Sequence, residues 1–150
     1  MRGVVTLPDS ATPLPPIHLL IAGLPLFSEL GMDDVARIAA GCREKSLVKG
    51  ELLFQKGDPA RGIYVVLSGQ IKLAFPSRRG TEKVVDIVGP RQSFGEAPVF
   101  TERSYPVNAE ALTDATVIMV SSAVLLALID EDRAFARKML AGLSMRLHSL

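Results

Sequence analysis

Short apolar segments separated by glycine-containing turns fill the middle of the chain, and this pattern constrains the fold more than any other feature. The segments are residues 47–48, 52–54, 63–67, 70–75 and 84–88. No long stretch with a helical period of 3.6 residues occurs between the glycines, which excludes a helical repeat. Regularly spaced short strands predict a β-sandwich or a small β-roll. Two strands on either side of Ser68-Gly69 predict a hairpin.

Helical patterns flank this region on both sides. Residues 18–22 predict a short helix, and apolar positions along residues 32–42 predict a second helix that ends near Gly41. After the glycine-rich region, residues 115–120 predict one more strand and residues 123–129 a helix capped by Ser121 or Ser122. The acidic residues 130–132 then open a final helix over 133–150. The expected class is therefore mainly β with helices at both ends.

Composition limits the kinds of protein that this chain can be. Its 150 residues, 48% hydrophobic and 22% charged, are typical of one globular domain. A net charge of +1 argues against a free-standing nucleic-acid binder. Cys42 is the single cysteine, so an internal disulfide and a four-cysteine metal site are excluded. The apolar run 17–27 is too short to span a membrane, and we expect a cytoplasmic protein.

One stretch, residues 93–111, carries the residues expected to bind a ligand. Gly95 and Ala97 can open a short helix whose free backbone N–H groups suit an anion. Arg103 can hold a phosphate through paired charge-assisted hydrogen bonds, and Ser104 can donate another. Glu96 can accept from a sugar hydroxyl. These five residues form the predicted effector-binding set, and we name residues 93–107 the cassette.

Structural interpretations of the same residues remain open. Arg103 can instead be a solvated loop arginine paired with Glu102, and the Glu96 carboxylate can instead tie down turn amides. Cys42 can be reactive beside basic Arg43 or can be a small buried thiol at a helix end. The aromatic residues Tyr64, Phe75, Phe94 and Phe100 are expected in the core rather than against a ligand.

Leucines recur along the final helix at steps of four and three residues. The row consists of Ala136, Leu140, Leu143, Leu147 and Leu150. This spacing is that of a coiled-coil seam, although the row can also cover the domain itself. Because Phe135 and Met139 can cover the domain, the leucine row is free for a second copy, and we expect a homodimer.

Residues 49–60 and 63–73 closely resemble the cyclic nucleotide-binding fold of the Crp/Fnr transcription regulators, and the resemblance extends over about residues 26–150. It implies a double-stranded β-helix (a jelly roll, or β-roll) with N-terminal helices and a long C-terminal dimerisation helix. In nucleotide-binding members, a Gly-Glu turn contacts the ribose, and an arginine followed by serine contacts the cyclic phosphate. The resemblance therefore implies these roles for Gly95, Glu96, Ala97, Arg103 and Ser104.

The resemblance also implies how the chain is organised. Residues 1–16 would be a flexible N-terminal arm, residues 17–132 the β-roll domain, and residues 133–150 the start of the dimerisation helix. In the family, a winged helix-turn-helix that reads DNA follows this helix, and nothing in residues 1–150 corresponds to it. The chain is thus expected to be a sensor domain that meets DNA only through such a further domain.

The identity of the effector stays open at this point. One candidate is a cyclic nucleotide such as cAMP. The loop between Glu96 and Arg103 is shorter than in nucleotide-binding members, and the cassette and residues 140–148 resemble the nitric-oxide-responsive Dnr-like branch, which is thought to use haem. His18 and His148 are then candidate axial ligands. A third alternative is a dimeric interaction module without a ligand. No P-loop, nucleophile elbow or metal-binding helix motif occurs, so we expect no enzyme and no resident metal.

Overall fold

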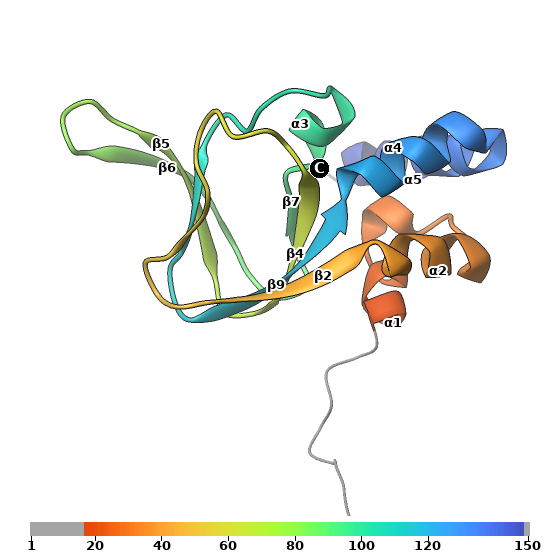
Figure 1. The fold of residues 1–150 in the computed structure, drawn as a ribbon, viewed down its shortest axis with the longest axis horizontal. Coiled ribbons are helices and arrows are strands. Elements are labelled where there is room, and N and C mark those ends of the chain that lie inside the picture. The colour runs from red at the N-terminus through yellow and green to blue at the C-terminus, as the bar shows by residue number, and fades with distance from the viewer. Residues whose placement is uncertain (1–16, 149–150) are drawn as a thin grey trace, which may run out of the picture.

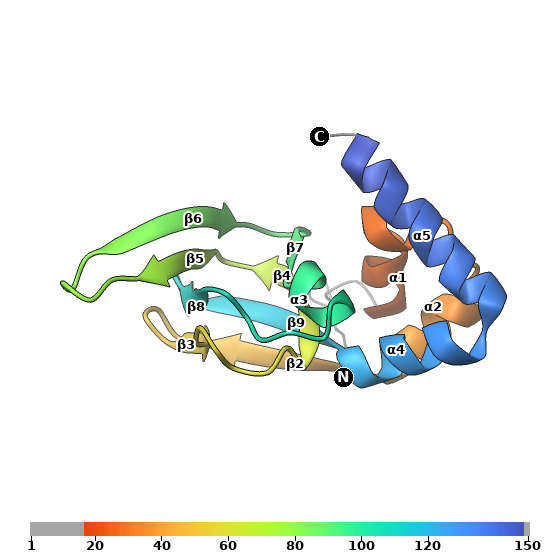
Figure 2. The same ribbon diagram turned by 90° about the horizontal axis from the view of Figure 1, so that it is seen from above.

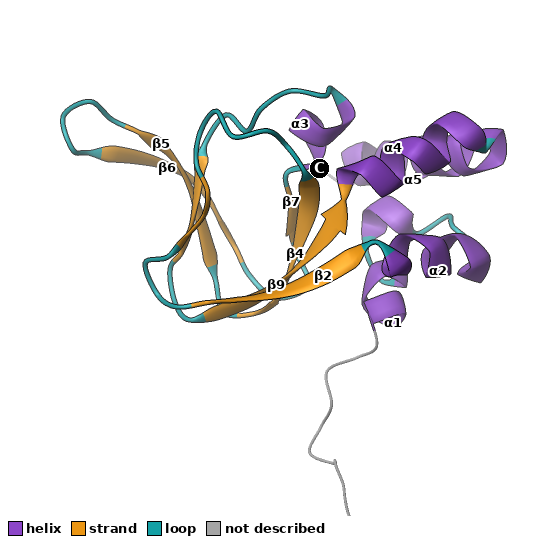
Figure 3. Cartoon of the chain, in the orientation of Figure 1, coloured by secondary structure: helices purple, strands orange, loops and turns teal. Residues whose placement is uncertain are grey.

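The computed structural model describes residues 17–148 and consists of two antiparallel sheets packed beside a group of helices (Figure 1). The strands gather on one side and most helices on the other, with α3 set above the strands (Figure 3). The predicted arm, residues 1–16, and Leu150 lie outside the described residues. Among the described residues, no helix is both long enough and apolar enough to cross a membrane.

The elements follow the order expected for a β-roll with helices at both ends. The helices are α1 (Ile17–Ala22), the 3₁₀ helix η1 (Pro25–Phe27), α2 (Met32–Ala40), α3 (Glu96–Phe100), α4 (Ser122–Glu131) and α5 (Arg133–His148). The strands are β2 (Cys42–Leu47), β3 (Leu52–Phe54), β4 (Gly62–Ser68), β5 (Ile71–Pro76), β6 (Glu82–Val88), β7 (Ser93–Phe94), β8 (Asn108–Ala111) and β9 (Ala115–Ser121). One sheet has the order β2-β9-β4-β7 and the other β3-β8-β5-β6. The predicted mainly β jelly-roll class is confirmed.

The hairpin predicted at Ser68-Gly69 is wrong. Strand β4 pairs with β9 and β7, whereas β5 pairs with β6 and β8, so the turn carries the chain from one sheet to the other. Gly69 has a φ of 80°, and a Cβ there would lie 2.2 Å from the carbonyl oxygen of Asp114. Glycine therefore permits a tight crossing that looks like a hairpin turn in the sequence.

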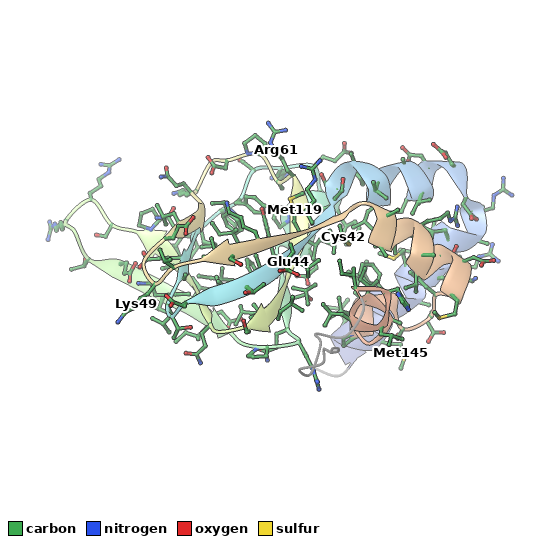
Figure 4. The ribbon with its side chains drawn as sticks, turned by 60° about the horizontal axis from the view of Figure 1, so that its bottom comes forward. Cys42, Glu44, Lys49, Arg61, Met119 and Met145 are labelled. Carbon is green, nitrogen blue, oxygen red and sulfur yellow. The ribbon has the colours of Figure 1, made fainter. Side chains whose placement is uncertain are left out.

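Strand β2 begins at Cys42, five residues before the predicted strand at residues 47–48. It is an edge strand whose middle residues, 43–46, are all exposed, so its sequence shows no apolar alternation. Figure 4 shows Cys42 and Glu44 along this strand. Cys42 donates from Sγ to the carbonyl of Ile38 at 3.4 Å, and burial raises the pKa of its thiol to about 11. The interpretation as a small buried thiol is therefore favoured over a reactive one.

Strand β4 separates two hydrophobic clusters. Ile63 and Val65 point into the cluster formed with the helices, whereas Tyr64 and Val66 point into the interior of the roll. This alternation follows from the two-residue period of a strand. Both faces of β4 are thus buried, and the cassette pairs with it through β7.

Helix α5 packs through one face only. Phe135 and Met139 are 0% and 2% exposed, and the backbone of Gly142 lies so close to η1 that a Cβ there would be 2.1 Å from the Leu26 carbonyl oxygen. Leu140 and Leu147, in contrast, are 64% and 68% exposed. Figure 2 shows α5 at the end of the molecule opposite the β5–β6 hairpin. Leu140 and Leu147 of the predicted row are therefore uncovered by the described part of the chain, whereas Ala136 is partly buried and Leu143 packs partly against the core.

Charged side chains join α2 to the start of α5. Asp34 is buried and forms ion pairs with Arg37 and, at 3.4 Å, with Lys138 of α5. Arg37 also pairs with Asp132 at 3.0 Å, and Asp132 accepts from the Phe135 N–H at 3.0 Å. Asp132 therefore caps α5, and the hydrogen bond from Phe135, with the pairing to Arg37, lowers its pKa.

We expect opposite outcomes for two truncations on α5. Phe135→Ala removes a fully buried ring and should lower the free energy of unfolding by about 3–5 kcal/mol. Met145→Ala removes a side chain that is 57% exposed and should change it by less than about 0.5 kcal/mol. Urea unfolding measures both, and equal losses would mean that α5 does not pack on the core as described.

Asp132→Asn should change how stability depends on pH. The lowered pKa means that the Asp132 carboxylate stabilises the folded state above its unfolded pKa of about 4, and that this contribution disappears as the pH falls through the folded value. Asparagine keeps the cap but not the charge. The variant should therefore unfold at lower urea concentration than the wild type at about pH 7, with a smaller difference at about pH 3. An unchanged difference would show that the charge contributes nothing.

Candidate functional site

The cassette begins with a glycine that the geometry requires. Gly95 follows β7 with a φ of 90°, a left-handed conformation that disfavours other residues. A Cβ on Gly95 would lie 3.4 Å from both the Gly62 carbonyl oxygen and the Tyr105 ring. Glu96 opens the five-residue helix α3, where a negative charge is favourable, and its carboxylate accepts from the Ser93 hydroxyl. Glu96 is therefore engaged with the cassette itself.

The second half of the cassette turns back toward the loop before β4. Glu102 has a φ of 54°, and the Arg103 N–H donates to the Pro98 carbonyl at 2.8 Å. Ser104 then forms an isolated bridge with Pro59. The predicted residues thus lie at the two ends of α3: Gly95, Glu96 and Ala97 at its start, and Arg103 and Ser104 beyond its end.

Arg103 faces solvent rather than the interior of the roll. Its guanidinium makes no hydrogen bond or ion pair within residues 17–148, so the alternative pairing with Glu102 does not occur there. It borders a cavity of about 430 Å³ between the cassette and the first turns of α4. Arg103 and Ser104 line the cassette side of this cavity, and Ser122 and Leu126 line the α4 side. The cavity thus offers a cation and two hydroxyls, and Glu102 adds one carboxylate.

Four aromatic rings fill the interior of the roll behind the cassette. Phe54 stacks on Tyr105 with ring centroids 3.6 Å apart and planes at 9°, and Tyr64 stacks on Phe94 at 5.5 Å. Phe54 also lies 5.8 Å from Tyr64 and 6.1 Å from Phe94. The core positions predicted for Tyr64 and Phe94 are confirmed, since both are buried. The core position predicted for Phe75 is wrong, since it is 41% exposed on β5, and Phe100 is only partly buried. Tyr105 was not predicted there, although a bulky residue directly after Arg103-Ser104 was a visible signal.

A smaller cavity of about 190 Å³ lies at the edge of this aromatic cluster. Its lining includes Phe54, Tyr64 and Tyr105 together with Arg61 and Met119. Arg61 lies at the outer edge of the roll and Met119 nearer its middle (Figure 4). The lining thus combines three aromatic rings with the charged residues Asp58 and Arg61.

One of the two candidate haem ligands, His18, lies away from the cassette. His18 is exposed on α1, and the side chain of His148 lies outside what the structure describes. His18 lines neither the cavity of about 430 Å³ nor that of about 190 Å³ beside the cassette. Within the described residues, no group of three or more histidine, cysteine, aspartate or glutamate side chains is placed to hold a metal. The haem alternative therefore stays a prediction, without support from the position of His18.

Known proteins are similar to this chain in both sequence and fold. Residues 44–132 match the cyclic nucleotide-binding domain family. The HTH-type transcriptional regulator Cmr of Mycobacterium tuberculosis is 30% identical over 118 residues, which is 79% of this chain and 48% of that protein. The cyclic AMP receptor protein of Thermus thermophilus is 28% identical over 125 residues, 83% of this chain and 58% of that protein. The chain thus spans about half the length of these two regulators.

Solved structures give the same result. A putative cyclic nucleotide binding protein from Ruegeria pomeroyi superposes with a TM-score of 0.81 at 30% identity, covering 89% of this chain and 59% of that one. The sensor domain of the transcriptional regulator DNR from Pseudomonas aeruginosa gives 0.75 at 28% identity, covering 88% and 89%. The family match spans more than half of the 150 residues, and the jelly roll, the cassette and the flanking helices are all present. The chain belongs to the cyclic nucleotide-binding domain family and is homologous to Crp/Fnr-type regulators.

Proposed function

We propose that this chain is the effector-binding regulatory domain of a cytoplasmic Crp/Fnr-type transcription regulator. Residues 17–132 would bind the effector, and residues 133–150 would start the helix that pairs two copies. DNA would be read by a separate domain. The observation that carries this proposal is the cavity of about 430 Å³, because residues of the cassette, of the loop before β4 and of helix α4 all line it.

The chemistry of this cavity favours a small anion that carries a phosphate. The guanidinium of Arg103 has no ion-pair partner within residues 17–148, and Ser104 and Ser122 belong to the same lining. Such groups bind phosphate through charge-assisted hydrogen bonds. A cyclic nucleotide such as cAMP carries one phosphate charge on a sugar and a planar base, and a relative is named a cyclic AMP receptor protein. We therefore take a cyclic nucleotide as the first effector to test.

Packing between the cassette and the final helix supplies a route for the signal. Val99 of α3 belongs to the same buried cluster as Leu125 of α4 and Phe135 of α5. An effector that moves α3 would change the packing of α4 and favour one position of α5 over another. This is a shift between pre-existing states, driven by the difference in effector affinity between them.

The uncovered face of α5 would join two copies. Leu140 and Leu147 are seven residues apart and so occupy equivalent positions along a coiled-coil seam. Ala136 and Leu143 of the same row are partly buried, and Leu143 also packs against the buried cluster of the domain. Pairing with a second copy would remove this apolar surface from water, which favours association.

Binding of cAMP should depend on Arg103. By isothermal titration calorimetry, we expect Arg103→Ala to weaken cAMP binding at least about tenfold, because a charge-assisted contact contributes about 1.5–3 kcal/mol. Arg79→Ala removes a matched exposed arginine from the β5–β6 turn, distant from the cassette, and should leave binding unchanged. Equal binding by wild type and Arg103→Ala would contradict the assigned role. Absence of binding of both cAMP and cGMP would reject a cyclic nucleotide effector and favour the ligand-free module.

Dimer formation should depend on the leucine row and not on other apolar residues of α5. We expect the double variant Leu140→Glu and Leu147→Glu to sediment as a monomer at concentrations where the wild type is a dimer, because it places like charges opposite each other. Met145→Glu is the matched control, since Met145 is exposed about 140° around the helix from Leu140. A dimeric double variant, or a monomeric wild type, would contradict pairing through this face.

A further inference from the structure

We propose that Tyr105 controls access to the interior of the roll: its ring occupies this interior, so that an effector enters the roll only when the ring is displaced. The position of the ring is given by the contacts described below. The link to effector binding rests on the function proposed above, and it extends the proposed site from the cavity of about 430 Å³, which Tyr105 does not line, into the interior of the roll.

Tyr105 points inward although its sequence neighbours point outward. It is 3% exposed, whereas Ser104 and Pro106 on either side are exposed. Its ring lies flat against Phe54, with centroids 3.6 Å apart. The cassette therefore inserts one of its own side chains between the two sheets, two residues after the arginine expected to hold a phosphate.

The hydroxyl of Tyr105 joins the later part of the cassette to the start of β4. It donates to the Gly62 carbonyl at 2.6 Å and accepts from the Gly62 N–H at 3.3 Å. Gly95, where the cassette begins, lies against the same carbonyl and the same ring. Tyr105, Gly62 and Gly95 thus form one junction, which we call the tyrosine latch. Burial raises the pKa of Tyr105, so the hydroxyl keeps the proton that it donates.

Gly62 has no room for a side chain at this junction. A Cβ there would lie 2.6 Å from Met119 Cγ and 2.8 Å from the Val120 carbonyl oxygen. Gly62 permits β4 to approach β9 closely. The N–H and the carbonyl of Gly62 both face the Tyr105 hydroxyl. The tyrosine latch therefore includes a residue of strand β4, Gly62, and not only loop residues.

The backbone of Tyr105 is held as well. Its N–H donates to the Asp58 carbonyl at 2.9 Å, and its carbonyl accepts from the Gly57 N–H at 2.9 Å. Displacing the ring therefore requires the loop before β4 to move with the cassette. Gly57 also lines the cavity of about 430 Å³, so an effector bound beside Arg103 would touch the segment that holds Tyr105.

Removal of the ring should open the interior of the roll. The cavity of about 190 Å³ already lies against Tyr105, so Tyr105→Ala would enlarge it into a space lined by Phe54 and Tyr64. Enclosed apolar cavities bind benzene, and the part of the space beside Phe54 and Tyr64 would be aromatic, whereas Asp58 and Arg61 line another part. We expect benzene to raise the melting temperature of Tyr105→Ala by several degrees and to leave that of the wild type unchanged. Tyr105→Phe keeps the ring and should resemble the wild type.

The second arm of the experiment measures the affinity of the same variants for cAMP. Tyr105→Ala should bind cAMP at least about tenfold more tightly than the wild type, as expected if the open state is a tenth of the population or less. Arg103→Ala added to Tyr105→Ala should cancel this gain. If Tyr105→Ala does not fold, Tyr105→Leu, which retains more apolar bulk, takes its place in both arms.

The two arms separate failure of this inference from failure of the proposed function. A folded ring-deleted variant that binds no benzene would overturn the assignment of Tyr105, whatever its affinity for cAMP. Benzene binding without any cAMP binding would uphold Tyr105 as the occupant and reject the cyclic nucleotide. Benzene binding with the same cAMP affinity as the wild type would show that the ring does not control access.

Discussion

Burial of strand β4 on both faces is the constraint on which the rest of this structure depends. Ile63 and Val65 hold the helices, while Tyr64 and Val66 form one wall of the roll. The cassette joins the same strand through β7, and the tyrosine latch joins it again at Gly62. Protein interiors are closely packed and transmit strain, so a displacement of the side chains on one face of β4 alters the packing on the other face. The domain can therefore connect an event in the cassette to the helices without a long chain of contacts.

The cassette in this structure is closed by its own residues. Glu96 is engaged with Ser93, Tyr105 fills the interior, and the two ends of the segment meet at Gly62. Arg103 and Glu102 are exposed, and neither side chain has an ion-pair partner within residues 17–148. Arg103 is thus an exposed cation beside an interior that the Tyr105 ring fills. A site of this kind is suited to respond to an anion, because anion binding can favour a state in which the tyrosine latch is open.

The sequence predicted where the helices and strands lie along the chain better than it predicted which strands pair with each other. Glycine spacing located most strands, and the helical periods located α2, α4 and α5. The hairpin at Ser68-Gly69 was wrong because a turn glycine does not reveal whether the next strand pairs with the last one or crosses to another sheet. Strand β2 was placed too late because an edge strand with exposed charged residues carries no periodic signal. Tyr105 was missed since the direction of a loop side chain depends on contacts with distant segments, here Phe54 and Gly62.

The close contact between Gly142 and η1 has a consequence for how α5 can move. With no side chain between them, the helix backbone rests directly on the carbonyl of Leu26, midway along α5. Residues on one face of a helix recur every three or four positions, so sliding α5 along its axis would bring a side chain one turn away, such as Met139, against that oxygen, whereas tilting about Gly142 would not. Gly142 is therefore a pivot about which α5 can tilt, and a displacement of its first turn, where Asp132 joins α4, would move its last turn in the opposite direction.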